Sequence, residues 1–235
     1  SAGMSGGDLT RRRLFQAAGA AGVAAGVTPR WAGAIGPQEP LFLTAPELRF
    51  LSAACDTLIP RDAHPSATEA GVIGYIDRQL SGPYGRGEGL YLEGPFFEGT
   101  PGQGWQLGMT PAAMMRAGMA AADRAADEFA SLTPSAQFDF LKALEEERVD
   151  LGEVPSGLFF SELLSLTNEG YFADPAYGGN RDYAGWELVG FPGAHAYYLD
   201  SVDRWNMAFD RQPYGMTHEP GAPGGGTFAP LRRRS

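Results

Sequence analysis

The histidines, the cysteine and the acidic clusters are the residues of this chain whose types could do chemistry. The three histidines are His64, His195 and His218, and none lies in an H-E-x-x-H or C-x-x-C context. Their spacing therefore predicts no local metal site, although three distant histidines could still meet in space. Cys55 is the only cysteine, so no disulfide can form within the chain. It sits in an apolar helical pattern and is interpreted as a small core residue.

Motifs for nucleotide binding and for an activated nucleophile are missing from the sequence. There is no G-x-S-x-G elbow, no P-loop and no dinucleotide-binding fingerprint. The glycine-rich run at residues 85–89 follows no predicted strand and is interpreted as a flexible loop. Residues 145–147 are interpreted as a solvated helix end, and Asp123 with Asp127 as ordinary surface patterning. We therefore expect no catalytic residue, no cofactor and no metal in this chain.

The stretch at residues 171–193 has residue types suited to binding rather than to catalysis. It mixes aromatics, glycines and charges without a helical or strand period, which predicts a structured loop held by aromatic packing and side-chain-to-backbone hydrogen bonds. Aromatic side chains and arginine are the usual anchors of protein interfaces. The alternative is a loop that packs on its own domain. The candidates for a partner interface are Tyr171, Asp174, Tyr177, Asn180, Arg181, Trp186 and Phe191.

The elements that must position this stretch are predicted to be helices. Thr44 and Glu47 form a capping box at the start of the first helix, and Pro60 ends it. Ser66 and Glu69 form a second box, followed by an apolar stripe at Val72, Ile76 and Leu80. Further helices are predicted to begin at Thr110-Pro111, at Thr133-Pro134 and around Pro155-Ser156.

The inward faces and the ends of these helices can also be predicted. The third helix should run to about Phe129, with small residues that suggest close packing. The fourth should turn Phe138, Leu141 and Leu144 inward, and Gly170 should stop the fifth. One more helix is expected within residues 194–212. Because no segment alternates with period 2, the fold class is all-α, a single helical domain with long loops rich in glycine and aromatic residues.

Residues 82–108 are predicted to form a long loop over the helical body. The segment is dense in glycine, proline and aromatics, and a loop of this length in a compact domain is usually functional or mobile. It supports an alternative function, an independent periplasmic enzyme or carbohydrate-binding protein with a pocket under the loop. The side chains that could line such a pocket are Tyr84, Tyr91, Phe96, Phe97 and Trp105.

The N-terminal region has the pattern of a twin-arginine export signal. Arg11, Arg12 and Arg13 follow Thr10, a weakly apolar stretch covers residues 14–27, and Ala32-Gly33-Ala34 offers a small-x-small cleavage site. The alternative is a disordered tail or a poor helix. The twin-arginine route moves folded proteins, so the signal predicts a chain that folds, or binds something, before export to the periplasm. Whether the signal is cleaved or stays as an anchor is left open.

These observations divide the chain into four parts. Residues 1–34 are a tag remnant and the signal peptide, 35–43 a linker, 44–219 the helical domain and 220–235 a flexible tail. Of 18 basic and 28 acidic residues, the part after residue 34 keeps 14 and 27, a net charge of −13. Such a charge argues against nucleic acid or an anionic lipid surface as a partner. Membrane contact is expected only through an uncleaved signal or through a partner.

Three motifs give the chain a resemblance to a known family. They are E-L-x-x-L-x-x-x-x-D-x-L-I-P-x-D at residues 47–62, followed by A-G-V at 70–72; L-T-x-E-G-Y-F at 166–172; and D-P-x-Y-G-G-N-R-D-x-x-G-W-x-x-x-G-F-P at 174–192. Together they resemble the small (gamma) subunit of gluconate 2-dehydrogenase and related sugar dehydrogenases, the subunit 3 family. The signature positions are Asp174, Pro175, Tyr177, Gly178, Gly179, Asn180, Arg181, Trp186, Gly190 and Phe191.

The resemblance implies an all-helical, non-catalytic accessory subunit of a periplasmic sugar, glycoside or sugar-acid dehydrogenase. Members of the family associate with a large FAD-containing subunit of the glucose-methanol-choline oxidoreductase type. In several complexes a multihaem cytochrome c completes the electron path. The small subunit is thought to bring the large one through the twin-arginine pore, so no cofactor is expected in this chain and FAD is expected in its partner. Neither the substrate nor the stoichiometry follows from the resemblance.

Overall fold

The computed structural model describes residues 39–97, 99–100, 106–193 and 213–216. The predicted signal peptide, the helix expected within 194–212 and the predicted tail lie outside these residues. The described residues from Pro40 onward belong to one compact unit, and apart from a single bridge between Gly193 and Tyr214 they contain no β-structure. The all-α class is confirmed for this part of the chain.

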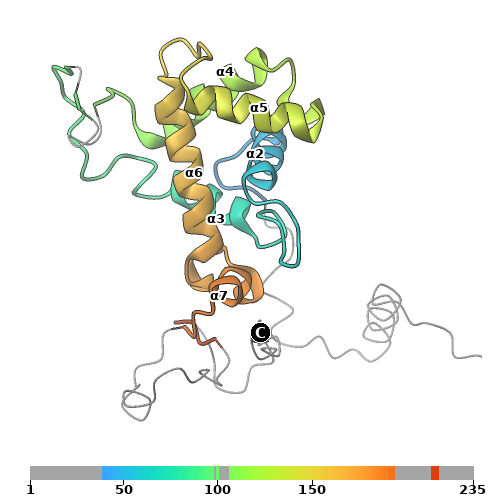
Figure 1. Ribbon diagram of the computed structural model, residues 1–235. Coiled ribbons are helices and arrows are strands. Elements are labelled where there is room, and N and C mark those ends of the chain that lie inside the picture. The colour runs from blue at the N-terminus through green and yellow to red at the C-terminus, as the bar shows by residue number, and fades with distance from the viewer. Residues whose placement is uncertain (1–38, 98, 101–105, 194–212, 217–235) are drawn as a thin grey trace, which may run out of the picture. The chain divides into compact units, whose positions relative to one another are not determined.

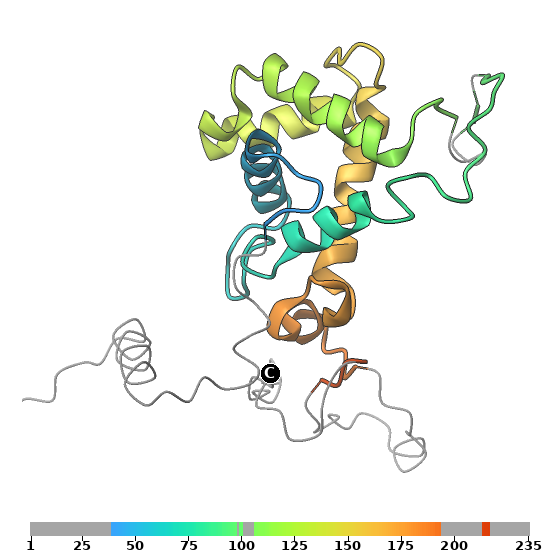
Figure 2. The same ribbon diagram turned by 180° about the vertical axis from the view of Figure 1, so that it is seen from behind.

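The described helices follow the chain order α2 to α7. They are α2 (Ala45–Leu58), α3 (Val72–Ser81), α4 (Pro111–Ala125), α5 (Pro134–Glu145), α6 (Ser156–Phe172) and α7 (Ala184–Val189), with short 3-10 turns η2 (Phe129–Ser131), η3 (Pro175–Tyr177) and η4 (Arg181–Tyr183). Figures 1 and 2 show α6 as the helix around which the others are arranged. It packs against α2, α3, α4, α5 and α7.

The core lies where α6 meets the other helices. Phe159 and Leu163 of α6 are fully buried, and the ring of Phe159 lies against α4. A Cβ at Gly118 of α4 would come within 2.3 Å of that ring, so only glycine allows the two helices this approach. The close packing predicted for the third helix is confirmed.

Three helix starts follow the capping residues predicted from the sequence. The Thr44 backbone N–H donates to Glu47 Oε2 at 2.7 Å, which forms half of the predicted capping box. Thr110 Oγ1 accepts from the N–H of Ala113 at 3.2 Å, and Thr133 Oγ1 from that of Ala136 at 3.4 Å. In each case a proline follows in the first turn, where its missing N–H costs nothing.

The second capping box forms, but the prediction that it opens a helix is wrong. The Ser66 N–H donates to Glu69 Oε2 at 3.0 Å, yet residues 67–71 are turns and α3 begins only at Val72. Gly71 has a left-handed φ of 85° and interrupts the helical path. The Ala70 carbonyl oxygen before it accepts from the Arg181 N–H at 2.8 Å, so a distant loop takes the place of the helical hydrogen bond.

Two predicted helix ends are also wrong. α4 stops at Ala125 rather than near Phe129, because Asp127 and Glu128 adopt left-handed φ values of 52° and 70°. Asp123, interpreted as surface patterning, accepts the Phe129 N–H at 3.0 Å and stabilises this turn. α6 passes through Gly170 and ends at Phe172. The missing side chain at Gly170 serves packing instead, since a Cβ there would lie 3.0 Å from Tyr75.

One inward residue of α5 was predicted incorrectly. Leu141 and Leu144 are buried as predicted, but Phe138 is 59% exposed. Phe140 packs against the core instead, with its ring centroid 5.7 Å from that of Phe129. Phe138 lies on the flank of the helix, about 60° from the direction of Leu141 on a 100° helical wheel.

The segment before α2 is fixed to the body by a buried carboxylate. Asp77 of α3 accepts the backbone N–H groups of Leu41, Phe42 and Leu43 at 2.7, 2.9 and 2.9 Å. Leu43 itself is 5% exposed and belongs to the core. Residues 41–43, which the sequence places in a linker, therefore pack with the helical domain. In the described residues no helix is both long and apolar enough to cross a membrane.

Candidate functional site

Asn180 is the central hydrogen-bonding residue of the stretch at 171–193, hereafter the signature segment. The residue is fully buried, and its backbone has a left-handed φ of 46°. Its Nδ2 donates to the Ala173 carbonyl oxygen at 2.8 Å, and its Oδ1 accepts the Gly185 N–H at 2.8 Å. One amide thus joins the end of α6 to the start of α7.

Trp186 fills the space under α7. It is 5% exposed, and its indole Nε1 donates to the Phe172 carbonyl oxygen at 2.7 Å. Its ring stacks on Tyr183 with centroids 5.2 Å apart and meets the edge of Phe191 at 5.0 Å. A tryptophan with a satisfied indole N–H and two aromatic neighbours is a packing residue.

Two signature-segment glycines allow backbone to lie against backbone. A Cβ at Gly179 would come 2.0 Å from the Gly170 carbonyl oxygen, and one at Gly185 would come 2.0 Å from that of Tyr171. The Tyr171 hydroxyl, from the last turn of α6, donates to the Pro65 carbonyl oxygen at 2.8 Å. The segment is therefore folded tightly onto the end of α6.

The structure brings the seven interface candidates into one folded segment, but it divides them by exposure. Tyr171, Asn180 and Trp186 are buried and hold the segment together, so they do not face a partner. Asp174 is partly buried, and its carboxylate accepts the N–H groups of Ala176 at 2.9 Å and Met216 at 2.7 Å. The candidates with exposed side chains are Tyr177, Arg181 and Phe191.

Of the exposed apolar residues in this region, the sequence analysis named Phe191 as an interface candidate but missed Leu188 and Val189. Phe172 is 37% exposed, Leu188 45%, Val189 61% and Phe191 44%, and we call these four residues the α7 surface. The signature segment was predicted to be a loop, which is wrong for residues 184–189 because they form α7. α7 has only six residues, too few for an apolar period to be visible. Trp186 lies beneath this surface, between the Phe172 backbone and the Phe191 ring.

Carboxylates on α6 tie neighbouring tyrosines to that helix. The Tyr75 hydroxyl donates to Glu169 Oε2 at 2.9 Å, and the Tyr84 hydroxyl donates to Glu162 Oε1. Burial and the nearby Glu169 carboxylate raise the pKa of Glu162 above its usual range. Burial and the bond to Glu169 raise the pKa of Tyr75. The Tyr75 phenol therefore stays protonated at neutral pH. Both phenols act as donors that hold α3 and residue 84 against α6.

The cysteine and the one histidine in the described part were checked for reactivity. Burial raises the pKa of the fully buried Cys55 thiol to about 12, so it stays protonated at neutral pH. Its sulfur lies 3.3 Å from Thr167 Oγ1, which confirms its interpretation as a core residue. Burial raises the pKa of the Glu187 carboxyl, and the nearby His64 only partly offsets this rise. Within residues 39–97, 99–100, 106–193 and 213–216, no three His, Cys, Asp or Glu side chains are arranged to hold a metal.

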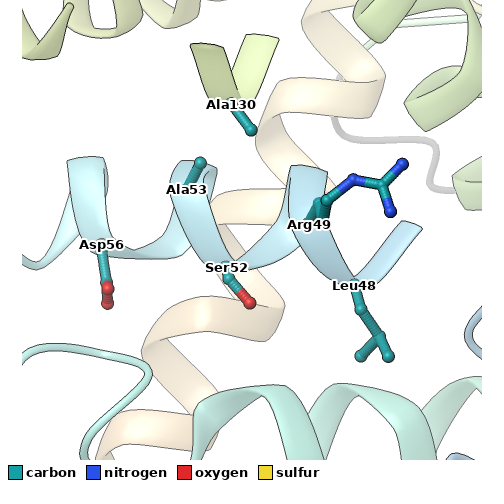
Figure 3. Close-up of a pocket in the computed structure, with 6 residues that line it drawn as sticks. All are labelled: Leu48, Arg49, Ser52, Ala53, Asp56 and Ala130. Carbon is teal, nitrogen blue, oxygen red and sulfur yellow. The ribbon is translucent and has the colours of Figure 1, made fainter. Parts of the chain in front are cut away.

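A shallow groove follows the outer side of α2. One hollow of about 420 Å³ is lined by Leu48, Arg49, Ser52, Ala53, Asp56 and Ala130. A second of about 480 Å³ continues from Ala53 and Asp56 to Phe138 on α5. Figure 3 shows Ala53 pointing toward Ala130, while Ser52 and Asp56 point to the other side of α2. Both Asp56 oxygens accept hydrogen bonds from Thr68, at 2.8 and 2.7 Å, so this carboxylate serves a turn.

The aromatics predicted to line a pocket under the 82–108 loop lie in different environments. Tyr84 packs against the core and donates to Glu162. Tyr91 and Phe97 are 69% and 74% exposed, and Phe96 packs only partly, over Gly94 and Gly108. Trp105 lies outside the described residues. The loop itself is confirmed for the described residues, which form turns and irregular backbone.

The comparisons with known proteins bear on the same residues. The family described as gluconate 2-dehydrogenase subunit 3 matches residues 45–193, from the first residue of α2 to the end of the signature segment. The search of curated proteins and the search of solved structures gave no match. The matched region covers more than half of the chain and contains every described helix. The chain therefore belongs to the gluconate 2-dehydrogenase subunit 3 family.

Proposed function

We propose that this chain is the non-catalytic small subunit of a periplasmic dehydrogenase that oxidises a sugar, a glycoside or a sugar acid. The observation that carries the proposal is the family match over residues 45–193. The catalytic partner would be a large FAD-containing subunit of the glucose-methanol-choline type, and a cytochrome c could accept its electrons. In this assignment the flavin chemistry belongs to the partner, and this chain supplies binding and export.

The α7 surface supports a role in binding another protein. Leu188, Val189 and Phe191 lie within four residues of each other and are all 44% exposed or more. Apolar side chains of this kind gain free energy when a partner protein removes them from water. They stand on a rigid base, because Asn180 and Trp186 beneath them have their side-chain hydrogen bonds made within the chain. A surface that is already ordered loses less entropy on binding.

The charge of the helical body favours a partner of another kind over a second copy. Residues 40–193 contain 9 basic and 22 acidic side chains. Two such bodies repel each other, whereas a partner surface that is neutral or basic around an apolar centre is attracted. A complex with a different, larger chain fits this charge distribution.

The export signal supports an escort role. Arg11, Arg12 and Arg13 begin a twin-arginine pattern, and that route carries folded proteins. A flavoprotein must fold around its cofactor before export. A flavoprotein without its own signal would reach the periplasm by binding this chain first.

The escort role is tested by following both proteins after Arg12→Lys and Arg13→Lys substitution. We expect the chain and its flavoprotein partner to accumulate together in the cytoplasmic fraction. Substitution of Arg232 and Arg233 by lysine makes the same chemical change at the other end of the chain and is the matched control. A flavoprotein that still reached the periplasm with the doubly substituted signal, or in a strain without this chain, would rule out the escort role.

A further inference from the structure

Residues 90–97 carry the second concentration of exposed apolar side chains in the described structure. Leu90 is 38% exposed, Tyr91 69%, Phe96 37% and Phe97 74%. Tyr91 and Phe97 keep most of their surface in water. Covering such aromatic rings is favourable in free energy, because each would bury a large apolar area. Soluble proteins seldom leave such a group of side chains uncovered without a binding role. We call residues 90–97 the arm.

The chain before the arm is fixed to the helical body. Tyr84 packs against the core and its hydroxyl donates to Glu162 of α6. The Gly85 N–H donates to the Gln79 carbonyl oxygen, and the Gly85 carbonyl oxygen accepts the Ala112 N–H, both at 3.0 Å. A Cβ at Gly85 would come 1.9 Å from the Leu80 carbonyl oxygen, so the backbone lies directly against the end of α3.

The described chain is fixed to the body again at Leu107 and Met109, whereas the arm makes no contact with the core. Leu107 and Met109 pack against the core just before α4 begins. None of the arm's apolar residues belongs to the core or packs against it. The Tyr91 hydroxyl donates within the arm, to the Gly94 carbonyl oxygen at 3.1 Å. Both views show the described segment after α3 running out from the helices (Figures 1 and 2).

We propose that the arm is a docking element whose Tyr91 and Phe97 side chains insert into an apolar groove on the larger subunit of the complex. The inference rests on the proposed function for the existence of that subunit, and it adds a second contact separate from the α7 surface. Two anchored ends and an exposed aromatic centre match the way interface anchors enter pockets.

Charge favours the larger subunit as the partner of the arm over a second copy of this chain or an anionic lipid surface. A second copy of the chain would bring another body with 9 basic and 22 acidic residues against the first. An anionic lipid surface would be repelled in the same way, and Glu93 within the arm is exposed. A groove on a different protein with a neutral or basic rim meets no such repulsion.

The test compares three forms of the complete chain, each purified together with the flavoprotein that accompanies the wild type. The arm variant carries Tyr91→Ser and Phe97→Ser. The matched control carries Phe138→Ser, which removes an aromatic side chain that is 59% exposed on α5. We expect the arm variant to bind the flavoprotein at least about tenfold more weakly than wild type. The control should bind as wild type does, and the melting temperatures of all three free chains should agree.

Several results would overturn the inference. If the arm variant held the flavoprotein as tightly as wild type, the docking role of the arm would be overturned, while the proposed function would stand. A wild-type chain that forms dimers which the arm variant loses would identify a second copy as the occupant instead. Co-sedimentation of wild type, but not of the arm variant, with phosphatidylcholine–phosphatidylglycerol vesicles would identify a membrane. A wild-type chain that retains no flavoprotein would overturn the proposed function, and the docking role with it.

Discussion

The Trp186 indole N–H donates to the Phe172 carbonyl oxygen across 2.7 Å, which places the tryptophan inside the signature segment rather than on its surface. The donor comes from α7 and the acceptor from the last residue of α6. This bond satisfies a carbonyl group at the end of α6 that has no partner within the helix. The same side chain supports Phe191 of the α7 surface from below.

Replacing Trp186 by alanine should therefore lower stability strongly. The substitution removes a side chain that is 5% exposed, its hydrogen bond and its contacts with Tyr183 and Phe191. We expect a loss of about 3–5 kcal/mol in the free energy of unfolding, measured by denaturant titration of the isolated chain. Val189→Ala, at a position 61% exposed, is the control and should change stability little. A Trp186→Ala chain as stable as wild type would contradict the packing role.

The signature glycine Gly179 should tolerate no side chain. Its Cβ would lie 2.0 Å from the Gly170 carbonyl oxygen, which is backbone and cannot turn away as a side chain can. Gly179→Ala should therefore lower the free energy of unfolding by about 1–3 kcal/mol or more. Gly74→Ala is the matched control, since a Cβ there would meet its nearest neighbour at an ordinary 3.6 Å within α3. That variant should be as stable as wild type or more stable.

Substitution of the α7 surface should separate binding from stability. Changing Leu188 and Val189 together to serine removes apolar side chains that are 45% and 61% exposed. We expect weaker retention of the flavoprotein, by about tenfold or more, with a nearly unchanged melting temperature. Equal retention measured for the double variant and wild type would show that the partner does not contact this surface.

Asp77 should be essential for the docking of the segment before α2. Its carboxylate accepts three backbone N–H groups, from Leu41, Phe42 and Leu43, and asparagine would supply only one acceptor oxygen. Asp77→Asn should cost about 1 kcal/mol or more in the free energy of unfolding, because a partly buried donor loses its partner. Hydrogen exchange of the three amides gives a local readout, and unchanged protection there would contradict this role.

Glu47 should make stability depend on pH in the acidic range. Burial alone would raise its pKa, but hydrogen bonds from Thr44 and the Arg116 guanidinium outweigh burial, so the pKa lies below its usual 4.5. A carboxyl with a lowered folded-state pKa adds stability above the unfolded-state pKa, and this is lost as pH falls through the folded-state pKa. The free-energy advantage of wild type over Glu47→Gln should thus be full at neutral pH and vanish in acid. An advantage that persisted there would contradict the assignment.

The starts of the helices were predictable because their signals are local. Thr110 and Thr133 cap the helices that follow them, each with a proline in the first turn. The ends were less predictable, because they depend on contacts from elsewhere in the chain. α6 passes through Gly170 since that glycine accommodates Tyr75, and α3 starts late since Arg181 bonds Ala70.

The candidate site was predictable as a segment but not residue by residue. Its composition identified residues 171–193 as structured, and the hydrogen bonds of Asn180 agree with that prediction. Which aromatics turn inward depends on the left-handed φ values at Asn180, Asp182 and Tyr183, which precede α7. Those turns hide the helical period, so the burial of Trp186 and the exposure of Leu188 could not be predicted from spacing.

The mass and flavin content of the purified complex test the central claim most directly. The chain would carry an affinity tag at its C-terminus, be isolated from the periplasm of its own host and be analysed by size-exclusion chromatography with light scattering. We predict one species, larger than the 25.0 kDa chain, in which this chain and a flavoprotein occur in a fixed ratio and the flavin absorbance co-elutes with both. A chain that elutes alone at its own mass, without flavin, would contradict the account.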